Sequence, residues 1–175
     1  MIYYSNSSRN NMKGDLMITH PIDPVYNNNS DILILGSFPS VKSRESMFFY
    51  GHPQNRFWKV TAAVFECSVP QTVQEKKSFL ISNHIAVWDV IKSCEITGSS
   101  DNSIKDAVAN DIGIIIKNSN VKKVFLNGKT AERYYNKYIK SETGIQTVCL
   151  PSTSPANAAW SLERLIQAWR IIRVE

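Results

Sequence analysis

The sequence DILILG, at residues 31–36, is the first of four short apolar runs that decide the fold. The others are IAVWD at 85–89, VKKVFLN at 121–127 and TVCLP at 147–151. Each run is rich in β-branched or aromatic side chains and is bounded by polar residues, glycine or proline. Such runs are typical of buried strands in a parallel sheet.

The segments between these runs have the periodicity of helices. In residues 55–66, Phe57, Val60 and Val64 fall on one face, and Asn55 is placed to cap the first turn. We expect further helices over residues 69–80, 103–117, 129–140 and 161–173. Strands that alternate with helices predict an α/β fold, a three-layer α/β/α sandwich around a central four-stranded, mainly parallel sheet.

The chain has 175 residues, enough to bury a core without disulfides or metal. We expect residues 1–17, rich in Asn and Ser, to form a flexible arm, and residues 18–175 to form a single domain. Cys67, Cys94 and Cys149 are far apart and form no C-x-x-C pair, which argues against a disulfide framework, zinc or an iron–sulfur cluster. We expect all three to be small buried side chains.

The net charge of +5 permits nucleic acid or an anionic membrane as a partner. No stretch approaches 18 apolar residues and the first residues hold no apolar signal region, so we expect a cytoplasmic protein that does not use a membrane. The motifs of dinucleotide-binding folds, P-loops, serine hydrolases and zinc proteases are all missing. Residues 37–58 hold a single carboxylate, Glu45, which disfavours a two-carboxylate sugar hydrolase.

Short polar segments follow the four predicted strands. They are SFPS, VIKSC, GKT and STSPAN. In an open parallel sheet such segments meet at the carboxyl edge, where ligands bind. Backbone N–H groups and helix N-termini at that edge suit phosphate. The pattern therefore predicts a crevice that accepts anions.

Two of these regions carry unusual side chains. Residues 35–60, LGSFPSVKSRESMFFYGHPQNRFWKV, mix polar groups and aromatic rings without alternation, which suits stacking on a base but also fits a loop packed over the sheet edge. Residues 150–157, LPSTSPAN, combine two prolines with three hydroxyls. Such a loop offers donors to phosphate, although an ordinary turn before a helix has the same composition.

These two stretches, GSFPSVKSRESMFFYGHPQNRFW and LPSTSPAN, resemble the hypoxanthine-DNA (deoxyinosine) glycosylase branch of the uracil-DNA glycosylase superfamily. The chain is more distantly similar to the mismatch-specific uracil glycosylases, which also carry an H-P-x-N-R-F-W-K segment. The resemblance spans residues 18–173 and includes IAVWDVIKSC, FLNGKTAERYY and SLERLIQAWR.

The resemblance implies a role for each matching residue. Phe38 stands where the mismatch-specific relatives place a catalytic Asn, so the implied catalytic group is Asn55, which orients water, bonds to the departing base or only caps the following helix. Tyr50 matches the aromatic residue that stacks on the flipped base. The implied base-binding residues are Ser37, Phe38, Phe49, Tyr50 and His52.

The implied DNA contacts lie in three loops. Ser152 and Ser154 match a loop that pinches the DNA backbone, and residues 155–157 match a wedge that fills the gap left by the flipped base. His52 and Asp89 also fit structural roles, a loop hydrogen bond and a loop brace. The predicted DNA-binding residues are Pro39, Ser40, Lys129, Ser152, Thr153, Ser154, Pro155, Ala156 and Asn157. Lys129 is included because the GKT loop places it within reach of a phosphate, although the basic run over 117–140 also fits a solvated face.

By this resemblance the protein is a monomeric, monofunctional DNA glycosylase. It would hydrolyse the N-glycosidic bond of a deaminated base in DNA, with hypoxanthine first and uracil or xanthine next, and would need neither metal nor organic cofactor. The alternatives are a mismatch-specific uracil or thymine glycosylase, a catalytically silent lesion-binding module, and an α/β domain that binds a free nucleotide.

Overall fold

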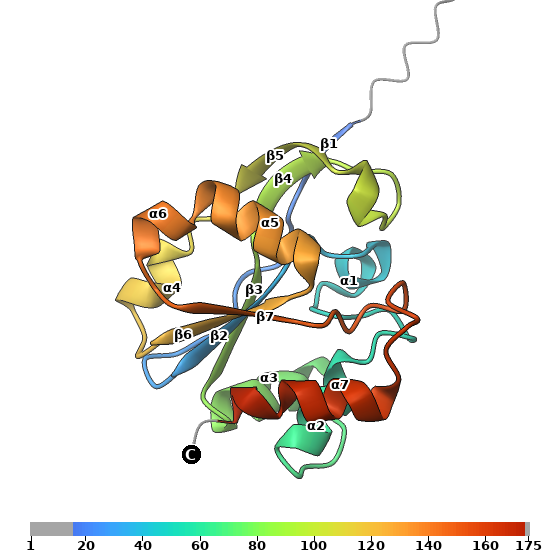
Figure 1. Ribbon diagram of the computed structural model, residues 1–175, viewed down its shortest axis with the longest axis vertical. Coiled ribbons are helices and arrows are strands. Elements are labelled where there is room, and N and C mark those ends of the chain that lie inside the picture. The colour runs from blue at the N-terminus through green and yellow to red at the C-terminus, as the bar shows by residue number, and fades with distance from the viewer. Residues whose placement is uncertain (1–15, 174–175) are drawn as a thin grey trace, which may run out of the picture.

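The structure, a computed structural model, describes residues 16–173. The predicted arm of residues 1–17 therefore lies outside the described residues, apart from Leu16 and Met17. Figure 1 shows a central sheet with helices on both of its faces. The prediction of a three-layer α/β fold around a four-stranded sheet is confirmed.

The central sheet contains the four predicted strands, and their order accounts for the position of a crevice at its edge. They are β2 (Ile32–Gly36), β3 (Ile85–Asp89), β6 (Lys123–Asn127) and β7 (Thr147–Leu150). The order is β3-β2-β6-β7, and all three pairings are parallel. The chain runs from β2 to β3 on one side of the sheet and from β6 to β7 on the other side, so the connections that leave the adjacent strands β2 and β6 diverge. A crevice opens at the carboxyl edge at such a reversal.

Alternate residues of β2 point into two separate cores. Ile34 packs with Phe125 under one helical layer, whereas Leu33 and Leu35 pack under the other. The first layer holds α2 (Phe57–Val64), α3 (Val73–Ser82), α7 (Leu162–Trp169) and the short turn η2 (Arg170–Ile172). The second holds α4 (Gly113–Lys117), α5 (Lys129–Tyr138) and α6 (Lys140–Thr143).

A second sheet, which the sequence did not predict, lies beside α5 in Figure 1. Its antiparallel order is β1-β4-β5, with β1 (Met17–Thr19), β4 (Ile91–Glu95) and β5 (Lys105–Ala109). The predicted helix over 103–117 is therefore wrong, because its first half pairs with β4 and α4 starts only at Gly113. The segment VIKSC, expected as a loop, forms β4 instead. Pairing between distant strands outweighs local helical preference here.

Three smaller features complete the fold. A short helix, α1 (Val41–Ser46), and the turn η1 (Asp101–Ser103) were not expected. The prediction of buried thiols is confirmed for Cys94 but wrong for Cys149, which is half-buried, and for Cys67, which is exposed. Within residues 16–173, no helix is long and apolar enough to cross a membrane.

Candidate active site

A cleft of about 900 Å³ lies at the carboxyl edge of the central sheet. Its walls come from the loops after β2, β6 and β7, from the segment before α2, and from residues 99–102 between β4 and β5. All the predicted site residues line this one cleft, although many are distant in sequence. They are Ser37, Phe38, Pro39, Ser40, Phe49, Tyr50, His52, Asn55, Lys129, Ser152, Thr153, Ser154, Pro155, Ala156 and Asn157.

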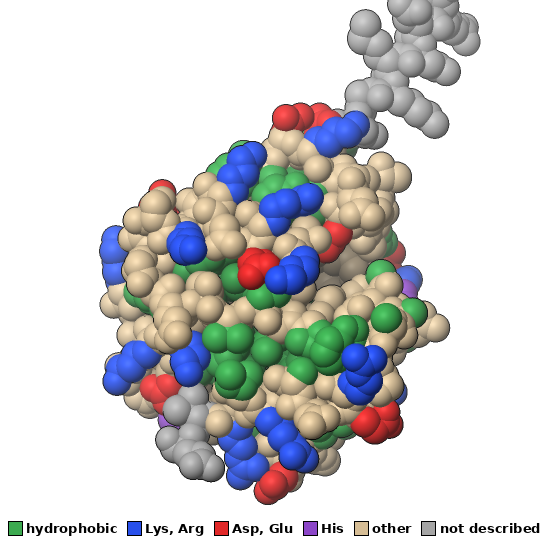
Figure 2. Space-filling view, viewed as in Figure 1, with side chains coloured by type: hydrophobic (Ala, Val, Ile, Leu, Met, Phe, Trp, Pro, Cys, Tyr) green, Lys and Arg blue, Asp and Glu red, His purple; other side chains and the backbone are tan. Residues whose placement is uncertain are grey.

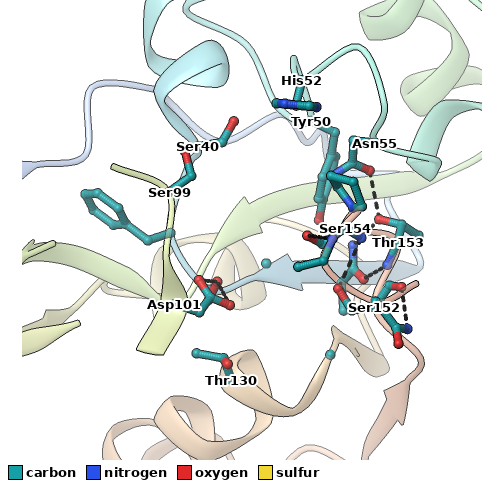
Figure 3. Close-up of a pocket in the computed structure, with 18 of the residues that line it drawn as sticks. Ser40, Tyr50, His52, Asn55, Ser99, Asp101, Thr130, Ser152, Thr153 and Ser154 are labelled. Atoms are coloured by element: carbon teal, nitrogen blue, oxygen red, sulfur yellow. Dashed lines mark hydrogen bonds between the residues drawn. The ribbon is translucent and has the colours of Figure 1, made fainter. Parts of the chain in front are cut away.

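Asn55 is held by its side-chain oxygen. The backbone N–H of Phe57 donates to Asn55 Oδ1 at 3.0 Å, so the side chain does bond to the first turn of α2. The hydroxyl of Thr153 donates to the same oxygen at 3.0 Å, as the dashed line in Figure 3 marks. Asn55 therefore joins the two motifs across the cleft and also supports the helix end.

Arg56 makes a second connection between the two motifs. Its guanidinium donates to the backbone carbonyls of Ser154 at 2.6 Å, Asn157 at 3.0 Å and Thr153 at 3.4 Å, and also to that of Trp160. Its own backbone N–H donates to the carbonyl of Thr153 at 3.0 Å. A planar cation with several donors is suited to collecting carbonyls in this way. Arg56 thus fixes the loop over residues 153–160 against the start of α2.

Tyr50 forms part of one wall, and one face of its ring is already covered. The ring stacks on Phe57 with centroids 3.8 Å apart. The hydroxyl is buried and has no hydrogen-bond partner among residues 16–173. Burial, together with the nearby charge of Asp89, raises the pKa of Tyr50 above its ordinary value, so the hydroxyl stays protonated. The backbone at Tyr50 has a φ of 53°, which is uncommon for a residue with a large side chain.

The other aromatic residues of the predicted base pocket are more deeply buried. Phe49 is 2% exposed and Phe38 is 7% exposed, so both form the back of the cleft rather than a free stacking surface. Phe38 packs edge-on against His20, with ring centroids 5.9 Å apart, and Arg44 lies over its ring. Because position 38 is a phenylalanine, it supplies no amide to the cleft.

His52 has a fixed pattern of donor and acceptor. The backbone N–H of Gln54 donates to His52 Nδ1 at 3.2 Å. In the neutral ring the proton must then sit on Nε2. The predicted structural hydrogen bond is therefore present. The Nε2–H group remains available to donate a hydrogen bond to a phosphate or a base.

The 150–157 loop is braced from within. Ser152 Oγ accepts the N–H of Ser154, Ser154 Oγ accepts the N–H of Ala156, and Asn157 donates to the carbonyl of Ser152. Both serine hydroxyls therefore keep their own protons for donation, as phosphate contacts require. Thr153 differs from its neighbours because it is fully buried. Ser152, Ser154 and Pro155 are partly exposed and also line the cleft.

Two further DNA-binding predictions fall at helix starts. Ser40 caps α1 by accepting the N–H of Ser43, and Pro39 precedes it in the cleft wall. Lys129 begins α5 and pairs with Glu132 at 2.7 Å in an exposed position. Figure 2 shows Lys and Arg side chains scattered over one face of the molecule rather than gathered into a single patch.

The structure adds a carboxylate that sequence reasoning missed. Asp101 accepts hydrogen bonds from the hydroxyl of Ser37 at 2.9 and 3.1 Å. It lies near Ser99 and Thr130, across the pocket from Asn55 in Figure 3. Burial raises the pKa of its carboxyl above the ordinary value, as is common at functional sites. No motif connects residue 101 to residue 37, because the second sheet brings them together.

A second carboxylate, Asp89, lies at the end of β3 and lines the same cleft. His20 Nε2 donates to Asp89 Oδ2 at 2.8 Å, while the N–H of Ile22 donates to His20 Nδ1. The backbone donor fixes the neutral tautomer of His20, with its proton on Nε2. A Cβ added at Gly36 would lie 2.2 Å from Asp89 Oδ1, so the absence of a side chain there makes room for the carboxylate. This geometry suits the bracing role expected for Asp89.

Comparisons with known proteins agree with the fold. The family model for the uracil DNA glycosylase superfamily matches residues 24–173. A protein from Methanosarcina acetivorans named "Hypoxanthine DNA glycosylase" is 34% identical over 150 residues, which cover 85% of this chain and 94% of the relative. One of the same name from Methanosarcina barkeri is 35% identical over 136 residues, which cover 77% and 85%.

A solved structure is similar as well. A solution NMR structure from Methanosarcina acetivorans, described as a candidate uracil DNA glycosylase, aligns with a TM-score of 0.75 and 28% identity. The match covers 91% of this chain and the whole of that chain. Fold and cleft together define an α/β protein with a cleft at the carboxyl edge of a parallel sheet. The chain belongs to the uracil DNA glycosylase superfamily.

Proposed function

We propose that this protein is a DNA N-glycosylase that removes a deaminated base, with hypoxanthine preferred, and leaves the DNA strand intact. The observation that carries the proposal is one cleft that unites the amide of Asn55, the ring of Tyr50 and the hydroxyl-rich 150–157 loop. The names of the two relatives from Methanosarcina support hypoxanthine as the base.

Binding requires the damaged nucleotide to leave the helical stack. This step costs a few kcal/mol, and less for a poorly paired base. Contact with an aromatic side chain such as Tyr50 offsets about 1–3 kcal/mol of that cost. The hydroxyls of Ser152 and Ser154 donate to backbone phosphates and hold the strand bent while the base occupies the cleft.

In the chemical step the bond between the base nitrogen and C1′ of the sugar breaks. Its electron pair leaves with the base, and the sugar becomes a cation that water attacks. The oxygen of water bonds to C1′, and the proton that it loses ends on the base. Side chains aimed at the developing charges lower this barrier. Asn55 forms a hydrogen bond with the departing base, and Asp101 lies on the opposite wall, where a negative charge on its carboxyl would stabilise the cationic sugar.

The protonation of the amine in the cleft supports monofunctional chemistry, in which the base is removed without cleavage of the strand. Among the described residues that line it, Lys129 carries an amine, and its pairing with Glu132 raises the pKa of that group. A Schiff base with the sugar requires a neutral amine. Lys129 therefore remains an ammonium that suits a phosphate contact. We place the enzyme in the cytoplasm with its DNA substrate and expect it to act as a monomer.

The test is release of free base from synthetic duplexes that carry hypoxanthine, uracil or xanthine. We expect hypoxanthine to be released fastest and the product strand to break only after alkaline treatment. Asn55→Ala should lower the single-turnover rate by about 10² to 10³. Gln54→Ala, an exposed neighbour, is the matched control and should keep the wild-type rate. Binding of the lesion without release of any base would instead support the silent module.

A further inference from the structure

The side chain of Asn55 has a single possible orientation. A backbone N–H only donates, so the Asn55 atom that faces the N–H of Phe57 at 3.0 Å must be the amide oxygen. That oxygen also faces the Thr153 hydroxyl at 3.0 Å. Because an amide oxygen only accepts, the hydroxyl must direct its proton toward Asn55.

A second backbone N–H fixes the other end of this network. The N–H of Thr153 donates to Asn127 Oδ1 at 3.0 Å, which leaves Asn127 Nδ2 to donate to the Thr153 hydroxyl at 3.0 Å. Thr153 is fully buried and Asn127 is 9% exposed. Neither group can exchange its partner for water. The backbone N–H groups of Phe57 and Thr153 therefore fix which atom donates and which accepts in every hydrogen bond of the network.

The network determines which part of Asn55 is available for chemistry. Its oxygen has two donors, whereas Asn55 Nδ2 bonds to none of residues 16–173 and is not buried. Asn55 lines the cleft, so the group that it offers there is an amide NH₂. This group has two donors and no acceptor.

We propose that Thr153 and Asn127 are positioning residues that make Asn55 a hydrogen-bond donor to the departing base. This inference rests on the proposed glycosylase function. The leaving base gains the electron pair of the broken bond, and an N–H donor stabilises that negative charge. An Asn that orients the attacking water must accept a hydrogen bond from it through its oxygen. That oxygen is already occupied by Phe57 and Thr153.

The first experiment measures single-turnover release of hypoxanthine by Thr153 variants. Thr153→Val removes the hydroxyl but keeps the shape, and should slow release about 10²-fold, as displaced catalytic groups do. Thr153→Ser keeps the hydroxyl and should restore most of the rate. Thermal melting of both variants checks that they are folded.

A double-mutant cycle separates positioning from general damage to the loop. If Thr153 acts through Asn55, then Thr153→Val should slow the wild type but not the Asn55→Ala variant. Equal factors in the two backgrounds would overturn the proposal, as would equal rates for Thr153→Val and Thr153→Ser.

Asn55→Asp tests the direction of the hydrogen bond and does not depend on the stability of Thr153 variants. The aspartate keeps an oxygen for Phe57 and Thr153 but presents an oxygen to the cleft in place of NH₂. We expect its rate at neutral pH to be no higher than that of Asn55→Ala. A faster rate would assign water activation to Asn55 and refute the donor role. Failure of the wild type to release base would refute the proposed function itself.

Discussion

Replacing Arg56 by lysine should loosen the loop that completes the cleft. The Arg56 guanidinium spans the carbonyls of four residues within 153–160, whereas a lysine ammonium is a single point of donation. Lysine keeps the charge and most of the length, so the comparison isolates the geometry of the donors. We expect it to retain about two of the four contacts, because its three N–H groups converge on one atom.

The size of the effect follows from the contacts that are lost. A hydrogen bond from a charged donor contributes about 1.5–3 kcal/mol, and the lower value applies where water can reach the freed carbonyls. Loss of two such bonds lowers the free energy of unfolding by about 3 kcal/mol. For a chain of this length, that corresponds to a decrease in Tm of about 6–12 °C.

Thermal melting followed by circular dichroism measures this change. The matched control is Arg164→Lys, because Arg164 donates to a single carbonyl, that of Ala159, from an exposed position. The control should change stability by no more than about 0.5 kcal/mol. Equal melting temperatures for Arg56→Lys and Arg164→Lys would show that the four contacts do not hold the loop. Because the loop carries Thr153, base release should fall in Arg56→Lys even well below its Tm.

Three further substitutions test the cleft walls. Gly36→Ala places a Cβ 2.2 Å from Asp89 Oδ1 and should lower the free energy of unfolding by about 1–3 kcal/mol in urea titrations; an unchanged midpoint would mean that the carboxylate moves freely. Tyr50→Phe removes a hydroxyl without a partner among residues 16–173 and should raise that free energy by about 1–2 kcal/mol, whereas a lower urea midpoint would reveal a partner. Asp101→Asn removes a carboxyl whose pKa is raised by burial, so the ionised form destabilises the fold above that pKa. The variant should therefore gain Tm relative to the wild type as pH rises from acid toward neutral, and a gain confined to low pH would contradict this sign.

Most of the central layer was predictable because its signals are local. The four strands are short apolar runs. A strand that is buried on both faces of a sheet is apolar at almost every position, so its sequence identifies it without knowledge of the neighbouring strand. The helix at 57–64 was expected two residues early, because Asn55 bonds to the first turn while the helix itself begins at Phe57. The strands at 91–95 and 105–109 were missed because each depends on the other for its pairing.

The candidate site was predicted as a set of residues but not as an arrangement. Thr153 was grouped with its serine neighbours as a DNA contact, yet it is fully buried and bonds to Asn55 and Asn127. Asp101 was missed, because only the second sheet carries it to Ser37. A sequence reports which side chains are present in a loop and leaves open which of them face inward.

The sequence alone determined the layer architecture, the edge of the sheet where ligands bind and the family. Hydrophobic periodicity and short motifs are properties of neighbouring residues, so they can be recognised in the sequence without any knowledge of distant contacts. Tertiary structure decided the arrangement of the site, namely that the oxygen of Asn55 is bonded to Phe57 and Thr153, that Arg56 holds the 153–160 loop and that Asp101 bonds to Ser37. These features depend on hydrogen bonds between residues up to 104 positions apart, such as that from Arg56 to the carbonyl of Trp160. Such bonds form only when the folded chain brings specific donors and acceptors into contact.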